Sequence, residues 1–66
     1  MTKTEAFRNL LQSQELLDEV EEMKKELTDM IVNSDDDEKA VREAAYLRIK
    51  TINELMARFE SIAKND

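Results

Sequence analysis

The sequence predicts an all-α protein that folds as an antiparallel two-helix hairpin, with helices over about residues 4–32 and 35–64. Three observations favour this fold. The 66 residues include no glycine and no proline, the two residues least compatible with a helix interior. Two long amphipathic patterns cover most of the chain, and a polar run, Ser34-Asp35-Asp36-Asp37, divides them. Such a short connection makes the two helices antiparallel neighbours.

The composition describes one small domain, residues 1–66, with a limited core. Hydrophobic residues make up 41% and charged residues 39%, which is typical of long surface helices and not of a disordered chain. A domain of this size buries roughly 60% of the surface that its unfolded chain exposes. Because the chain lacks Cys and His, disulfides and most metal sites cannot compensate. Self-association is the remaining source of extra stability.

The first predicted helix begins with a capping box. Thr2 stands three residues before Glu5. In this arrangement the Thr hydroxyl accepts a hydrogen bond from a main-chain N–H group of the first turn, and the Glu side chain reaches back.

An apolar seam runs along the second half of this helix. Its members follow a 4-3-4-3 spacing: Leu16, Val20, Met23, Leu27 and Met30. Continued towards the N-terminus, the seam would reach Ser13 and Asn9, whereas Phe7 and Leu10 are rotated around the helix. We therefore expect either a kink near residues 12–14 or two apolar faces that contact different partners. A short separate N-terminal helix, with a new start at Ser13, is the less favoured alternative.

The second predicted helix starts at the polar run. Ser34 is its expected N-cap, and the three Asp residues 35–37 fall in the first turn, where carboxylates meet the positive end of the helix dipole. Calcium binding by residues 35–38 is the weaker alternative, because an EF-hand loop spreads its ligands over about twelve residues around a glycine.

The second helix carries a broad apolar face made of two 4-3 seams. One comprises Val41, Ala45, Arg48, Ile52, Leu55, Phe59 and Ile62, and the other comprises Ala45, Ile49, Ile52, Met56, Phe59 and Ala63. One seam packs against the first helix and closes the hairpin. The other stays exposed to solvent unless another molecule packs on it. The simplest cover is a second copy, which gives a homodimer in the form of a four-helix bundle. The residues expected at this oligomer interface are Leu16, Met23, Met30, Ile49, Ile52, Met56, Phe59 and Ala63.

The hairpin also predicts which residues of the two helices face each other. If the chain turns within the polar run, Phe7 lies opposite Ile62. The same register places Arg48, the one polar member of the first seam, close to Glu21 and Glu22, so that its charged group pairs at the edge of the contact.

The residue types disfavour catalysis. Without His or Cys the chain lacks the usual general bases and strong nucleophiles, and it has no glycine-rich loop to bind a phosphate. We expect no enzymatic activity, no cofactor and no metal ion. Tyr46 and Leu47 lie off both seams, where they either form a second contact surface or are covered by a neighbouring chain.

Charge and hydropathy also limit the partners. The formal net charge of −6 works against binding to nucleic acid or to an anionic membrane surface. No segment has the length of a membrane span or the form of a signal peptide, so we expect the cytoplasm of the producing cell, or a virion if a phage encodes the chain.

Four stretches of the sequence resemble a known family. Residues 6–11 with their Leu-Leu pair, residues 19–31, the Arg-Glu-Ala-Ala-Tyr-Leu stretch at 42–47 and residues 55–62 look like small two-helix proteins encoded among the head and packaging genes of tailed bacteriophages. This resemblance implies an accessory protein of the virion or of its assembly.

A second resemblance is to the Rop family of plasmid copy-number regulators. It is carried by the N-terminal residues 1–5, the acidic turn at 35–38 and Ala57-Arg58-Phe59. The resemblance implies a hairpin that dimerises and binds paired RNA loops, with Lys3, Asn9, Gln14 and Lys25 as counterparts of the RNA-binding side chains.

The sequence therefore predicts a non-enzymatic helical module for protein–protein interaction that pairs with itself, and with another phage or host protein if it is an assembly component. A Rop-like nucleic-acid-binding regulator is the alternative. A further alternative is an inhibitor of a host enzyme that presents an acidic face to a basic groove of that enzyme. The acidic face comprises Glu15, Asp18, Glu19, Glu22 and Glu26.

Overall fold

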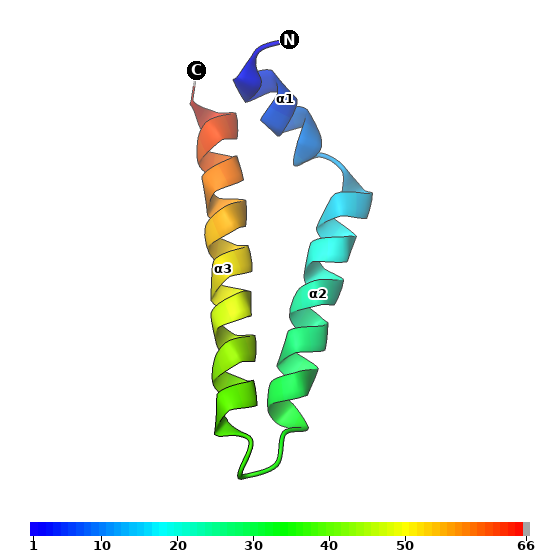
Figure 1. Ribbon diagram of the computed structural model, residues 1–66. Helices are drawn as coiled ribbons and strands as arrows, with labels where there is room; N and C mark the ends of the chain where they lie inside the picture. The colour runs from blue at the N-terminus through cyan, green and yellow to red at the C-terminus, as the bar shows by residue number, and fades with distance from the viewer. Residues whose placement is uncertain (66) are drawn as a thin grey trace.

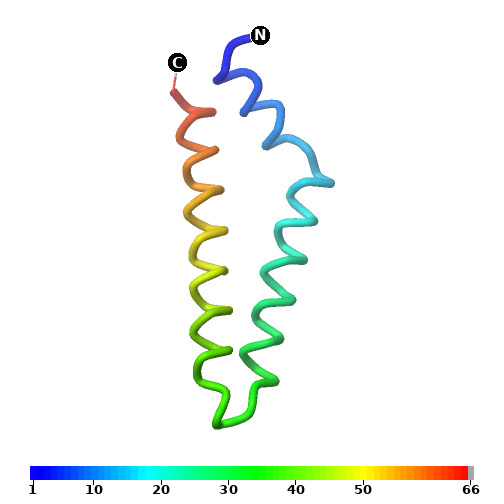
Figure 2. The backbone as a smooth tube through the Cα atoms, viewed as in Figure 1, coloured from blue at the N-terminus to red at the C-terminus, as the bar shows by residue number. Residues whose placement is uncertain are grey.

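The protein consists of three α-helices in one layer (Figure 1), as seen in a computed structural model that describes residues 1–65. The helices are α1 at Lys3–Leu10, α2 at Gln14–Val32 and α3 at Lys39–Lys64. α1 and α2 follow each other along the straight α3 and run antiparallel to it, as the backbone trace in Figure 2 makes clear. The overall dimensions are 50 × 19 × 12 Å. The all-α prediction is confirmed for the described residues, which contain no β-strand.

The predicted two-helix hairpin is wrong, because the first helix of that prediction is divided in two. α1 ends at Leu10 with Leu11 as its C-cap, and the N–H groups of Gln12 and Ser13 each donate to a carbonyl three residues earlier, at 3.1 Å. Such bonds tighten the last turn of a helix. The side chain of Ser13 then accepts a hydrogen bond from the N–H of Leu16 at 3.3 Å and caps α2. The less favoured alternative, a separate N-terminal helix with a new start at Ser13, is therefore the correct one.

The break allows both helices to present apolar side chains to α3. At about 100° per residue, Phe7 and Val20 would lie roughly 140° apart around one continuous helix. With the break, Phe7 packs against Phe59 of α3, the ring centroids 5.1 Å apart and the rings tilted by 49°. The Arg8 side chain reaches the carbonyl of Ala63, so α1 lies beside the last turns of α3, the part of that helix in which the hairpin register places the partner of Phe7.

The loop between α2 and α3 also differs from the prediction. α3 begins at Lys39, so the Asp residues 35–37 lie in the loop and not in the first turn of the helix. The hydroxyl of Ser34 donates to the carbonyl of Ile31 at 2.7 Å, and it closes α2 instead of capping α3. Glu38 occupies the N-cap position of α3 without a side-chain cap bond, and its carboxylate accepts from the N–H of Asp35 at 2.9 Å.

Arg42 explains why Ser34 is not available as a cap. Its guanidinium donates to the Ser34 hydroxyl at 3.2 Å and to the carbonyls of Asp35 and Asp36 at 2.6 and 3.4 Å. One side chain from the first turn of α3 thus holds three oxygen atoms of the preceding loop.

The core is small and lies along the contact of α3 with the other two helices. Its buried hydrophobic residues are Leu27, Ala45 and Ala63, and among the described residues no large side chain is fully buried. Ala45 is only 1% exposed, and its small side chain allows α2 to approach α3 closely. Most apolar side chains are therefore covered on one side only, which leaves a considerable apolar surface for contacts with other molecules.

Candidate functional site

The main apolar hollow of the surface is a groove between α2 and α3. Met23, Leu27 and Met30 of α2 and Ile52 of α3 form its floor, and its volume is about 430 Å³. The polar residues that line it are Glu26, Arg48 and Thr51. We call these seven residues the open groove. An apolar floor with a few polar groups at the rim is typical of a surface that binds another molecule.

The groove continues into exposed apolar side chains. Met23 and Leu55 are each 51% exposed, and Met30 is 43% exposed. Leu55 follows Ile52 by three residues and Thr51 by four, so it lies on the same face of α3 as the groove lining. We call the open groove together with Leu55 the open face.

The two walls of the groove carry opposite charge. α2 contains seven acidic and two basic residues, which gives a net charge of −5. α3 contains six basic and three acidic residues, which gives +3. Glu26 on one wall and Arg48 on the other repeat this polarity inside the groove.

The register of the two helices differs from the sequence prediction at Arg48. That prediction placed Arg48 beside Glu21 and Glu22, whereas the structure places it in the groove with Glu26. The connection between α2 and α3 spans residues 33–38, which is longer than a turn within the polar run.

The predicted interface residues fall into separate groups. Met23, Met30 and Ile52 meet in the open groove. Met56 lines a different hollow of about 360 Å³, with Leu17 and Val20 of α2. The sequence pattern could not show which side of the helix contact each residue would occupy.

The other predicted residues do not line the open groove. Phe59 packs against Phe7 of α1, and Ala63 is buried. Leu16 and Ile49 are half-buried, and neither belongs to the lining of the open groove. Phe59 and Ala63 therefore serve the packing of the chain itself.

Leu27 and Glu26 belong to the groove but were not among the predicted interface residues. Leu27 belongs to the predicted apolar seam. It follows Met23 by four residues, so the sequence could have placed it at the same interface as Met23. Glu26 could not be identified, because a glutamate on an acidic helix resembles every other solvated glutamate.

Tyr46 and Leu47 lie on the exposed surface of α3, with Leu47 four residues before Thr51 of the open groove and Tyr46 farther around the helix. Each is 58% exposed, which settles that neither is covered by α1 or α2. Tyr46 precedes Leu55 by nine residues, which corresponds to half a rotation around the helix. The side of α3 opposite the open face thus carries one exposed aromatic side chain, that of Tyr46.

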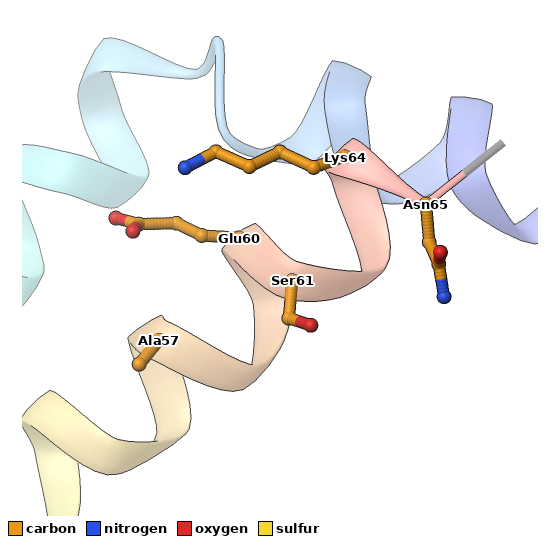
Figure 3. Close-up of a pocket in the computed structure, with 5 residues that line it drawn as sticks. All are labelled: Ala57, Glu60, Ser61, Lys64 and Asn65. Carbon is orange, nitrogen blue, oxygen red and sulfur yellow. The ribbon is translucent and has the colours of Figure 1, made fainter.

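A second hollow of about 430 Å³ lies at the C-terminal end of α3 and is shown in Figure 3. It is lined by Ala57, Glu60, Ser61, Lys64 and Asn65, all from α3 and its C-cap. In Figure 3 the side chains of Glu60 and Lys64 extend in the same direction, while Ser61 and Asn65 point elsewhere. Because one helix supplies the whole lining, this hollow lacks the opposing walls of the open groove.

Within residues 1–65, no three His, Cys, Asp or Glu side chains are placed to hold a metal ion. No described helix is both long and apolar enough to cross a bilayer.

Comparison with protein-family models, with curated proteins and with solved structures finds no match for this chain. The resemblances to phage head proteins and to the Rop family therefore stay predictions.

Proposed function

We propose that the protein is a non-enzymatic module for protein–protein interaction, and that the open face is the surface it uses. The observation that carries this proposal is the amount of surface that the chain leaves exposed. A compact monomer of 7.7 kDa has an accessible surface of about 4,300 Å² by the usual scaling with mass. This chain exposes 5260 Å².

The excess corresponds to one protein interface. It amounts to about 900 Å², and a stable protein–protein interface buries about 800 Å² on each partner. The side chains of the open face also suit such a contact, because methionine adapts its shape to a partner surface and leucine adds apolar area. A partner on this face would complete the core that the three helices leave half-covered.

The charge distribution disfavours the Rop-like alternative. Gln14 and Lys25 would belong to an RNA-binding surface on α2, yet that helix carries −5. A helix of this charge repels a phosphate backbone. A role as a bacteriophage accessory protein is compatible with the proposed module and is supported by the sequence resemblance alone.

The proposal is tested by photo-crosslinking in the cells that make the protein. Benzoylphenylalanine replaces Leu55 on the open face in one variant and Tyr46 in a matched control, since these sites are similarly exposed and lie half a rotation apart on α3. We expect a discrete protein adduct from position 55 and none from position 46. Absence of an adduct at position 55, or equal adducts at the two positions, contradicts the proposal.

A further inference from the structure

The surface that the chain leaves exposed is large enough for a dimer of this chain. The chain exposes 5260 Å², an excess of about 900 Å² over a compact monomer of its mass. Each partner of a stable dimer buries about 800 Å², so the excess on two copies is enough for them to cover each other.

The charges of the helices select one of two arrangements. In a two-fold dimer with its layers face to face, the axis lies in the interface, either along the helices or across them. An axis across the helices places α2 on α2 of the partner, so two helices of −5 face each other. An axis along the helices places α2, at −5, on α3 of the partner, at +3. Opposite charges favour the second arrangement, and like charges disfavour the first.

The arrangement also determines which residues of the two copies meet. Glu26 and Arg48 line the same groove from opposite walls, so they lie at similar heights along the helices. Rotation about an axis parallel to the helices keeps that height and exchanges the walls. Glu26 of one copy then faces Arg48 of the other, and the pair occurs twice in the dimer.

We propose that the partner of the open face is a second copy of this chain. The two copies are related by a two-fold axis parallel to the helices, with Glu26 of each subunit paired with Arg48 of the other. This inference rests on the proposed function and names the partner of the same surface. The loops between α2 and α3 lie at the same end of the dimer.

The first test measures mass and affinity by light scattering and sedimentation equilibrium. We expect wild-type protein to have twice the protomer mass of 7.7 kDa. Glu26→Arg and Arg48→Glu each turn two attractive contacts into repulsive ones and raise the dimer Kd about tenfold or more. Lys50→Glu is the matched control, because it makes the same charge change two residues from Arg48, at a position outside the groove.

A mixture of the two single variants separates contacts between subunits from contacts within one. In a heterodimer of Glu26→Arg with Arg48→Glu, both pairs between subunits are restored, while within each chain positions 26 and 48 keep the same sign. We expect the mixture to dimerise with a Kd close to that of wild type. A mixture no tighter than the two separate variants overturns the assigned pairing.

The second test locates the loops. The chain has no Cys, so Asp36→Cys introduces a unique site for a spin label in the exposed loop. With the axis along the helices, two helix layers about 10 Å apart keep the labels within about 30 Å of each other. With the axis across the helices, the labels lie at opposite ends of a dimer 50 Å long. A long distance overturns the arrangement.

The two proposals fail in different ways. A wild-type protein that stays monomeric at 200 μM overturns the second copy as partner. A groove-specific adduct of another mass would then still support the interaction module, whereas absence of any adduct would end both proposals.

Discussion

Arg8 in α1 donates a hydrogen bond through Nη2 to the main-chain carbonyl of Ala63, 3.0 Å away and 55 residues later in the chain. The hydroxyl of Thr4 donates in the same way to the carbonyl of Asn65. The last carbonyls of a helix have no partner within the helix and carry its negative end. α1 therefore caps α3 from outside, with a positive charge where the dipole favours one.

Loss of the Arg8 contact will weaken the end of α3. We expect Arg8→Ala to lower the free energy of unfolding by about 1 kcal/mol. Amide hydrogen exchange should accelerate in α1 and in the last turn of α3, and not in the part of α3 near residue 45. Arg8→Lys keeps the positive charge, so we expect it to lower the free energy of unfolding by less than Arg8→Ala does. Uniform acceleration across all three helices would show that Arg8 acts on global stability and not as a cap.

The Phe7–Phe59 contact is expected to hold α1 in place. Phe7→Ala removes a half-buried ring from a pair at 5.1 Å, and we predict a loss of about 2 kcal/mol. Urea unfolding followed by circular dichroism measures this loss. Phe7→Leu retains much of the apolar area and should cost less than half as much. If the alanine variant is as stable as wild type, α1 does not contribute to the core.

Arg42 is predicted to order the loop before α3. Arg42→Ala leaves three oxygen acceptors of residues 34–36 to water and should cost about 1–2 kcal/mol. Arg42→Lys is expected to retain only part of this stability, because an ammonium group cannot reproduce the planar arrangement of N–H donors of a guanidinium. Proteolysis in the loop should rise in the alanine variant. An unchanged cleavage rate would count against this role.

Ser13 is predicted to set the start of α2. Ser13→Ala removes the acceptor for the N–H of Leu16 and should lower stability by about 1 kcal/mol. Ser61→Ala, at an exposed position in the last turn of α3, is the control and is expected to be neutral or slightly stabilising, because alanine favours a helix more than serine does. Equal effects of the two changes would mean that the Ser13 cap is not used in solution.

Local patterns in the sequence predicted the helix start at Thr2 correctly. The N–H of Glu5 donates to the Thr2 hydroxyl at 3.1 Å, and that hydroxyl donates to the Glu5 carboxylate at 3.2 Å. A capping box involves residues three positions apart, so its outcome depends little on the rest of the chain. The local pattern at Ser34 predicted an N-cap for the last helix, and that prediction was wrong. The hydroxyl of Ser34 is bound by Arg42, eight residues later in the chain.

The break between α1 and α2 could be described from the sequence but not decided. Polar residues at positions 9 and 13 interrupt the apolar seam, and a kink, a second apolar face and a second helix all explain them. The choice depends on α3, because only a separate α1 brings Phe7 onto Phe59 while α2 keeps its own seam on α3. A one-dimensional pattern does not contain that contact.

The candidate site was predicted in part. Met23, Met30 and Ile52 were expected at an interface and line one groove. Phe59 was expected there as well but is occupied by α1. The spacing of apolar residues defines the two seams of the long helix, whereas their assignment to a neighbouring helix or to an open surface depends on the register of the whole layer.

The single layer of helices has a consequence for how this protein can evolve. The thickness of 12 Å is about one helix diameter, so few side chains are covered on all sides, and among the described residues only Leu27, Ala45 and Ala63 are buried hydrophobic residues. Leu27 is one of the few buried residues and also part of the groove floor. A substitution there changes the stability of the fold and the shape of its recognition surface together. A protein with a separate core can place fold stability and partner recognition on different residues, so that each evolves independently. In this chain a change at Leu27 affects both properties at once.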